Sequence, residues 1–234
     1  KANEQLAEFA FIASHDLQEP LRKIQAFSSH LLRPEANLND YAKNYSQKIN
    51  ASSSRMSKLV RDLLSFSVLS LSDKKLITVD LNETVKYVVD DFGTSIESKH
   101  AIINVSHLPS IHAVPVQMSQ LFHNLISNAL KFSKENPRIN VTAENVTGES
   151  ISKYELDKAR QYVAILVSDN GIGFDQKYTS KLFVLFQRLH TMKGIDGSGV
   201  GLAICKKIVE DHQGVILANA EENEDATFTV ILPI

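Results

Sequence analysis

One histidine, His15, lies in a segment whose residue types could accept a phosphoryl group. The segment Ser14–Leu21 has the sequence SHDLQEPL, which places an acid beside the histidine and Pro20 five residues after it. A neutral imidazole is plentiful near pH 7 and is a competent nucleophile. Pro20 cannot donate a hydrogen bond to the carbonyl of Asp16, so we expect local distortion just after the histidine. A lone helical histidine is more often a surface or packing residue, so this interpretation requires a phosphate source elsewhere.

Clustered glycines provide a candidate for that source. Of nine glycines, six lie between positions 171 and 201. The sequence DNGIG at Asp169–Gly173 follows an apolar run, and GSGVGL at Gly197–Leu202 opens directly into an expected helix. Backbone N–H groups and the helix dipole at such a helix start favour an anion. The pattern is neither a P-loop nor a dinucleotide-binding fingerprint, because it lacks Gly-Lys-Ser/Thr and no early βαβ unit precedes it.

Polar residues on one helix add a possible metal site. Asn124 and Asn128 are four residues apart, so they share a helix face, and Lys131 lies on nearly the same face. Neutral oxygens and a cation suit a Mg²⁺ ion that is otherwise held by phosphates and water. The alternative is an ordinary solvated polar face.

The elements that position these residues fall into two domains, predicted as 1–72 and 73–234. Residues 3–33 and a second segment from Tyr41 to about Phe66 show the apolar periodicity of amphipathic helices, with a break at 33–40. Because a two-helix hairpin buries little surface, we expect two copies to form a four-helix bundle.

The second domain mixes helix and strand patterns and predicts an α/β (α+β) sandwich, with one mixed sheet covered by helices on one face. Asn82 is the expected N-cap of a helix running to about Lys99, and Gly214 the expected end of a helix over 200–212. Residues 147–160 read as a polar insertion and 171–199 as irregular. Strands are expected at 77–80, 101–105, 110–113, 138–146, 162–169, 215–220 and 227–232, and a further helix at 115–132, begun by Pro115.

Composition excludes several classes of protein. The net charge of -2 gives no indication of a nucleic-acid partner or of an anionic membrane surface. A single cysteine, Cys205, excludes an intramolecular disulfide and is expected to be a small buried residue. No apolar run approaches the length of a membrane span. Because the chain starts at Lys1 and is helical at once, we expect a cytoplasmic fragment of a larger sensor, whose upstream part could be soluble or membrane-anchored.

Together these motifs resemble the histidine kinase family, within the superfamily that shares the Bergerat ATP-binding fold. The resemblance covers nearly the whole chain. Ser14–Leu21 is similar to the phosphoacceptor box and Asn124–Lys131 to the asparagine box. Asp169–Gly173 and Gly197–Leu202 are similar to the two glycine boxes, and Phe183–Phe186 to the phenylalanine box. The run FVLFQRLH that starts at Phe183 is particularly similar to kinases of the phytochrome type.

The resemblance implies the cofactors ATP and Mg²⁺ and a role for each residue. His15 is the phosphoacceptor and Asp16 takes its proton. Asp169 accepts a hydrogen bond from the adenine amino group, and Asn128 ligates Mg²⁺ with the catalytic Asn124 beside it. A lid between the glycine boxes orders over ATP. The remaining ATP-binding residues are Lys131, Gly171, Gly173, Phe183, Phe186, Arg188, Gly197, Gly199, Gly201 and Leu202. The implied partners are a second copy, as a homodimer, and the receiver domain of a response regulator.

Two departures narrow the expected activity. Many relatives carry threonine or asparagine four residues after the histidine, where this chain has Glu19; we expect weak or absent phosphatase activity. Hydrolytic members of the superfamily carry a glutamate where this chain has Asn124, so transfer to His15 should be favoured over hydrolysis. The alternatives are a GHKL-type ATPase, which rapid turnover without a phosphohistidine would indicate, and a non-catalytic nucleotide-binding signalling module.

Overall fold

The computed structural model describes the backbone of residues 2–33, 38–71, 75–187, 199–220 and 225–234, and the side chains of these residues except 2–16 and 65–71. The chain divides into two compact units, Lys1–Ser72 and Asp73–Ile234, and each is described by itself. Within the described ranges, no helix combines the length and the apolar character needed to cross a membrane.

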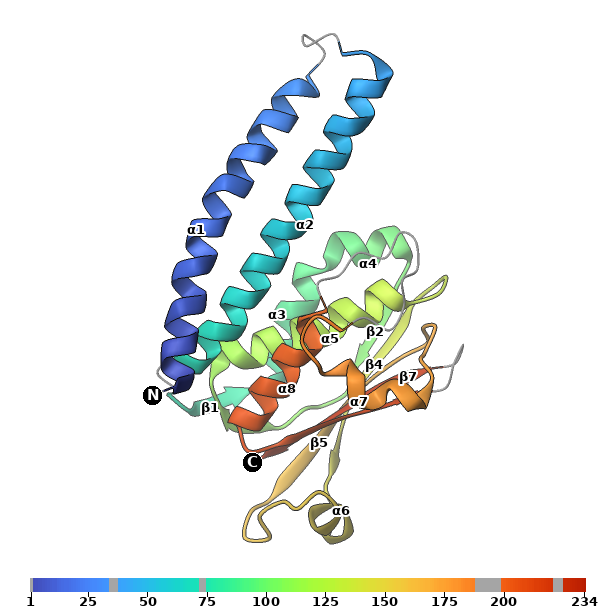
Figure 1. Ribbon diagram of the computed structural model, residues 1–234. Coiled ribbons are helices and arrows are strands. Elements are labelled where there is room, and N and C mark those ends of the chain that lie inside the picture. Colours follow the sequence, from blue (N-terminus) through green and yellow to red (C-terminus); the bar gives the residue numbers. More distant parts are fainter. Residues whose placement is uncertain (1, 34–37, 72–74, 188–198, 221–224) are drawn as a thin grey trace. The chain divides into compact units, whose positions relative to one another are not determined.

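The first unit is a helical hairpin of α1 (Ala2–Leu31) and α2 (Asp40–Leu71), which pack along each other (Figure 1). Both predicted helices are therefore confirmed. Asn39 ends the loop as an N-cap, because its Oδ1 accepts a 2.9 Å hydrogen bond from the Ala42 N–H. The helical conformation of α1 continues through Pro20.

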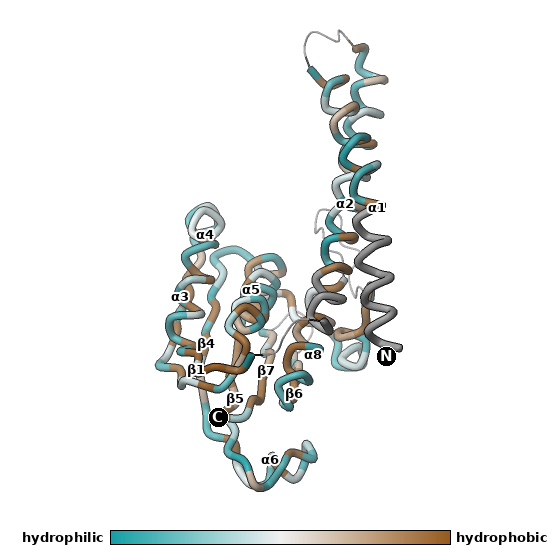
Figure 2. The backbone as a smooth tube through the Cα atoms, turned by 90° about the vertical axis from the view of Figure 1, so that its left-hand side faces the viewer, coloured by the Kyte–Doolittle hydropathy of each residue, from teal (hydrophilic) through white to brown (hydrophobic). Residues whose placement is uncertain are grey.

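Small polar residues fill the space between α1 and α2. Ser53 Oγ donates to the Leu21 carbonyl at 2.9 Å, and Gln25 Nε2 donates to Ser57 Oγ at 3.2 Å. The buried serines of the hairpin are Ser28, Ser46, Ser53 and Ser57. Hydrophobic residues nevertheless recur along both helices (Figure 2), and the large ones are mostly exposed. The exposed apolar face consists of Leu17, Ile24, Phe27, Leu31, Tyr41, Tyr45, Ile49 and Met56.

The second unit is built on a five-stranded sheet of order β2-β4-β5-β7-β6. The β2–β4 pair is parallel, and the other three pairs are antiparallel. The strands are β2 (Ile102–Val105), β4 (Arg138–Asn145), β5 (Tyr162–Asp169), β6 (Val215–Ala220) and β7 (Ala226–Pro233). The prediction of one sheet is wrong in one respect: β1 (Ile77–Asp80) and β3 (Ser110–Ala113) pair only with each other.

Helices cover one face of this sheet (Figure 1). The helix α5 (Pro115–Phe132) packs on β4 and β5, and α8 (Gly201–Asp211) packs on β6, β7 and α5. Pro115 lies in the first turn of α5, as predicted. The apolar face of α5 is completely removed from water, which is the main source of stability for this layer. Its buried hydrophobic residues are Met118, Leu121, Phe122, Leu125, Ile126, Ala129 and Leu130.

The helix expected from Asn82 to Lys99 is two helices, α3 (Leu81–Asp91) and α4 (Gly93–Lys99). The predicted N-cap is also wrong, because Asp80 accepts the Asn82 N–H at 2.7 Å. Asn82 instead links the start of α3 to Leu108, donating to its carbonyl and accepting from its N–H. Asp80 is therefore the N-cap, in the place that the sequence pattern assigned to Asn82.

His212 connects α8 to the start of α5. Its ring accepts the Val114 N–H at 3.1 Å through Nε2, while Nδ1 lies 2.8 Å from the Ile208 carbonyl. Both contacts are made by a neutral ring with its proton on Nδ1. The following residue, Gln213, takes the left-handed conformation (φ 58°) just after the end of the helix. Gly214 is needed for a different reason: a Cβ there would collide with the Ile231 carbonyl.

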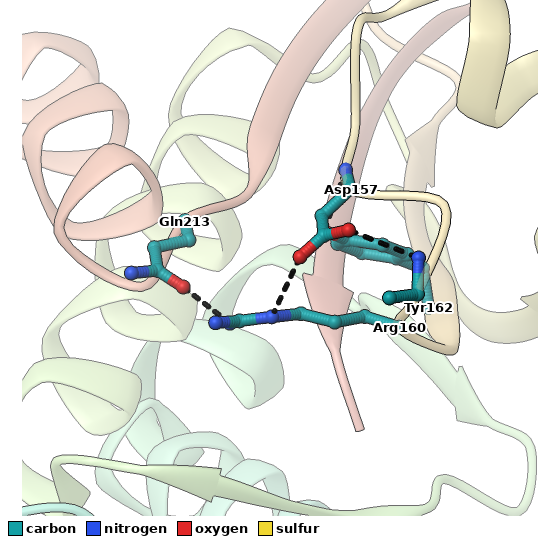
Figure 3. Close-up of polar contacts among 5 residues, drawn as sticks. Asp157, Arg160, Tyr162 and Gln213 are labelled. Atoms are coloured by element: carbon teal, nitrogen blue, oxygen red, sulfur yellow. Dashed lines mark hydrogen bonds and ion pairs between the residues drawn. The ribbon is translucent and has the colours of Figure 1, made fainter.

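The polar insertion between β4 and β5 contains a short helix, α6 (Gly148–Lys153), and a polar network (Figure 3). Arg160 donates to the Gln213 side chain, and its Nε lies 3.4 Å from an Asp157 carboxylate oxygen. The Asp157 N–H contacts the hydroxyl of Tyr162 at 3.3 Å. The insertion is thereby tied to the turn after α8.

Candidate functional site

Asp169 is the last residue of β5 and lies opposite Ile139 on one neighbouring strand and Ala226 on the other. Only 6% of the residue is exposed. Its Oδ1 accepts a 2.9 Å hydrogen bond from the Gly171 N–H. The sheet therefore holds a carboxylate at a fixed position beneath the first glycine segment.

Burial raises the pKa of Asp169 to about 6, and the nearby Asp225 carboxylate acts in the same direction. The Gly171 N–H opposes these effects by stabilising the charged form. A carboxylate withdrawn from water in this way gains strongly from one more N–H donor. That is the chemistry required to select a base with an exocyclic amino group.

Gly171 lies in close contact with the end of α5. A Cβ at this position would stand 2.7 Å from the Phe132 carbonyl oxygen and would also collide with the Asp169 carboxylate. The Ile172 N–H donates to that same Phe132 carbonyl at 3.1 Å. The first glycine segment and the last turn of α5 are consequently one packed unit, in which only glycine fits.

The last turn of α5 is held from a second side by Lys99, whose Nζ donates to the Leu130 carbonyl at 2.6 Å. Asn124, Asn128 and Lys131 lie along α5 and are each half-buried. The Lys131 ammonium lies 4.5 Å from the ring centroid of Phe132.

Asn124 faces the second glycine segment, because a Cβ at Gly201 would lie 3.5 Å from its Oδ1. The Asn124 Nδ2 is buried and has no hydrogen-bond partner among the described residues. Cys205 is buried in the same helix pair, as predicted, and burial raises the pKa of its thiol to about 12 despite a smaller opposing effect of Asn124. The Asn124 amide on α5 faces the start of α8 and can donate to a ligand oxygen there.

The phenylalanine segment contacts the second glycine segment through the backbone. The Phe186 N–H donates to the Gly199 carbonyl at 3.0 Å, and both residues are left-handed (φ 63° and 71°). A Cβ at Gly199 would lie 2.8 Å from the Gln187 carbonyl oxygen. Phe183 and Leu202 are half-buried, whereas Phe186 is 53% exposed.

Several predicted site residues cannot be placed fully. Arg188 and Gly197, with much of the predicted lid, lie outside the described residues. His15 and Asp16 are placed only as backbone within α1. Within the described part of the region expected to be irregular, the structure has two short elements, a 3₁₀ turn η2 (Gln176–Tyr178) and α7 (Thr179–Leu182).

Two residues that position the site were missed by the sequence analysis, namely Lys99 and Gln176. Gln176 reaches from η2 to β6, where its Nε2 donates to Asn219 Oδ1 at 2.8 Å and its Oε1 accepts the Ala220 N–H at 3.3 Å. A lysine near a helix end and a glutamine at the start of a 3₁₀ turn belong to no motif, so the sequence alone does not identify their partners.

Two family models match this chain. The model of histidine kinase-, DNA gyrase B- and HSP90-like ATPases matches residues 113–234, and that of the His Kinase A phospho-acceptor domain matches residues 5–70. The chain therefore belongs to the histidine kinase-, DNA gyrase B- and HSP90-like ATPase family. Its phospho-acceptor domain places it among the histidine kinases of that family, as the sequence motifs predicted.

The relatives in sequence include phytochrome-like proteins, as expected from the Phe183–His190 run. Phytochrome-like protein Cph1 of Synechocystis sp. is 35% identical over 236 residues, which take in 100% of this chain and 30% of that protein. Cyanobacterial phytochrome A of Nostoc sp. is 36% identical over 239 residues, 100% of this chain and 29% of that protein. Sensor histidine kinase WalK of Bacillus subtilis is 27% identical, again over 100% of this chain and 37% of its own length. The chain thus spans about a third of these relatives.

Solved structures show the same fold. The catalytic domain of histidine kinase ThkA superposes with a TM-score of 0.54 at 25% identity, covering 68% of this chain and 95% of that domain. Full-length ShkA in complex with AMPPNP gives a TM-score of 0.69 at 24% identity, covering 97% of this chain and 45% of ShkA.

Proposed function

We propose that the whole protein is an ATP-dependent protein histidine kinase, which phosphorylates His15 and passes the phosphoryl group to an aspartate of a response-regulator receiver domain. The observation that carries the proposal is the presence in one chain of a phospho-acceptor hairpin and an ATPase-type domain with a buried carboxylate, Asp169, beside the first glycine segment. The sequence relationship to sensor histidine kinases supports it.

In this proposal the imidazole of His15 attacks the γ-phosphorus of ATP. A P–N bond forms, the bond from the γ-phosphorus to the β–γ bridging oxygen breaks, and ADP leaves. Asp16 accepts the proton released by the ring. Positioning and charge neutralisation supply most of the rate, as in other phosphoryl transfers.

Asp169 accepts a hydrogen bond from the adenine amino group, and Gly171 and Gly173 allow the backbone to approach the base. Gly173 has φ 57°, a conformation that favours glycine. We assign the phosphate end to the start of α8, which the buried Asn124 amide of α5 faces as a suitable donor. The further ATP contacts proposed are Lys131, Phe183, Phe186, Arg188, Gly197, Gly199, Gly201 and Leu202.

The residues present fit a Mg²⁺ ion that takes most of its ligands from phosphates and water. The described residues contain no cluster of three or more His, Cys, Asp or Glu side chains able to hold a metal alone. Mg²⁺ typically keeps waters and substrate phosphates as ligands and needs few protein oxygens. We propose the amide oxygen of Asn128 as its protein ligand, with Asn124 alongside. When bound, the ion neutralises charge on the phosphates.

We propose that the hairpin forms a homodimer as a four-helix bundle. Its eight exposed large apolar residues would be buried against a second copy, whereas the described side chains already buried within the hairpin are those of Leu21 and four serines. An unsupported apolar face of this extent is unfavourable in a monomer.

The deciding experiment incubates the protein with γ-labelled ATP and Mg²⁺ and compares wild type with His15→Gln. We expect acid-labile, base-stable label on wild type and none on the variant. Equal labelling of the two proteins would contradict the proposal. Rapid hydrolysis without labelled protein would instead indicate an ATPase.

A further inference from the structure

Gln176 lies outside every motif of the family, yet among the described residues its side chain hydrogen-bonds the segment after the first glycine box to β6. We propose that Gln176 is a positioning residue for nucleotide binding, acting as the distal anchor of a strap formed by residues 170–178. The inference rests on the proposed function, because it assigns Asp169 and Gly171 to the base.

The register of the sheet defines the two ends of the strap. Asp169 on β5 pairs with Ala226 on β7, and Ala226 pairs with Ala220 on β6. These three residues therefore lie in one row across the sheet. The strap leaves this row at Asp169 and returns to it at Ala220, where Gln176 Oε1 accepts the backbone N–H.

The strap is longer than the gap that it crosses. Two strand spacings separate β5 from β6, which is about 10 Å. The seven residues from 170 to 176 could reach about 23 Å when extended. Chain length alone consequently leaves the strap free to take many paths, and contacts must select one.

Side chains provide these contacts in sequence. Phe174 is buried against Phe228 of β7, with ring centroids 6.4 Å apart. Asp175 then caps the 3₁₀ turn by accepting the Lys177 N–H at 3.0 Å. Gln176 completes the path, since its amide donates to the Asn219 side chain and accepts from the Ala220 backbone N–H.

The Gln176 anchor is connected to the second glycine segment as well as to the first. The Thr179 hydroxyl donates to the Gln176 carbonyl at 2.8 Å, which joins the turn to α7, and the Phe186 N–H beyond α7 contacts Gly199. If the anchor is lost, the nucleotide must order the strap when it binds. The entropy lost in that ordering weakens the affinity for the nucleotide. Gln176 and Asn219 are exposed, so their hydrogen bond should matter less for global stability.

The test uses the chemistry of the Gln176–Asn219 pair. In Gln176→Glu the carboxylate still accepts from Ala220, and the Asn219 amide can rotate to donate. In Asn219→Asp the new carboxylate still accepts from Gln176. The double variant Gln176→Glu/Asn219→Asp places two acceptors against each other, and Gln176→Ala removes the group.

We would measure the Kd of a non-hydrolysable ATP analogue, then KM and kcat for autophosphorylation, at pH 7.5. We expect Kd and KM to stay within about two-fold of wild type in each single carboxylate variant. They should rise about five-fold or more in Gln176→Ala and in the double variant, with kcat within about two-fold. A matched control is Gln213→Ala, which removes an exposed glutamine that contacts Arg160 (Figure 3) away from the strap; its Kd should not change.

Unchanged Kd in Gln176→Ala would overturn the inference while leaving the proposed kinase intact. So would equal weakening in the two single variants and the double variant, since the pair would then not matter. If wild type itself binds no analogue, the proposed function and the inference both fail.

Discussion

The Gly171 N–H donates a 2.9 Å hydrogen bond to Oδ1 of Asp169, two residues earlier in the chain. This single contact offsets only part of the cost of burying the carboxylate, because the pKa of Asp169 still rises to about 6. The fold therefore holds an acceptor whose charge is incompletely compensated until a ligand donor arrives.

Asp169→Asn should stabilise the protein without ligand while weakening adenine binding. The folded pKa is above the ordinary value of 3.8, so the folded state binds more protons, and wild-type stability falls as pH rises from about 4 to 6. The neutral amide avoids this loss, which is worth up to about 3 kcal/mol above pH 6 and nothing below pH 4. Urea unfolding at pH 4 and pH 7.5, with calorimetric titration of the ATP analogue, checks both effects. A variant less stable than wild type at pH 7.5 would contradict the argument.

Gly171→Ala should damage both folding and binding. The added methyl group would collide with Asp169 and lie 2.7 Å from the Phe132 carbonyl, so we expect a loss of about 1–3 kcal/mol. Gly93→Ala is the matched control, because a Cβ there meets nothing within 4 Å. Thermal denaturation should show a lower Tm only for the Gly171 variant, together with a weaker Kd. Similar Tm values for the two variants would show that the contact at Gly171 is not tight.

His212→Ala should lower the free energy of unfolding by about 1–3 kcal/mol. The substitution leaves the buried Val114 N–H without its 3.1 Å acceptor, and a buried unpaired donor carries its full desolvation cost. Gln213→Ala, next in the chain but exposed, should cost less. Equal losses on denaturant titration would mean that the His212 contact adds nothing.

The helices and strands could be predicted from the sequence more accurately than the residues at their ends or the side-chain contacts between them. Periodicity predicted the hairpin and α5, because a continuous apolar face dominates both. The cap of α3 was misassigned since Asp80 and Asn82 are equally good capping types, and only geometry shows that Asp80 accepts. Motif spacing predicted Asp169 and Asn124 as site residues, because the motifs that contain them are local in the sequence. It could not identify Gln176 or Lys99, whose partners lie 44 and 31 residues away.

Phe27→Glu should convert the proposed dimer to monomer. Phe27 is 67% exposed on the apolar face of the hairpin, and a second copy would have to bury the new charge. Lys23→Gln on the same helix is the control, because it breaks only the exposed ion pair with Glu19. Sedimentation equilibrium should give a monomer mass for Phe27→Glu and a dimer mass for Lys23→Gln. A dimeric Phe27→Glu protein would exclude this face as the interface.

Glu19 is the residue that should limit phosphatase activity. Its side chain is 55% exposed and places a carboxylate four residues from His15, and the ion pair with Lys23 at 2.7 Å is itself exposed and therefore offsets that charge only weakly. A phosphorylated aspartate would be repelled, and a carboxylate does not position a water as an amide or hydroxyl does. We expect His15→Ala dimers to leave the dephosphorylation rate of a phosphorylated receiver domain unchanged within two-fold. Adding Glu19→Asn should raise that rate several-fold, and an already accelerated rate in His15→Ala alone would show that Glu19 is no obstacle.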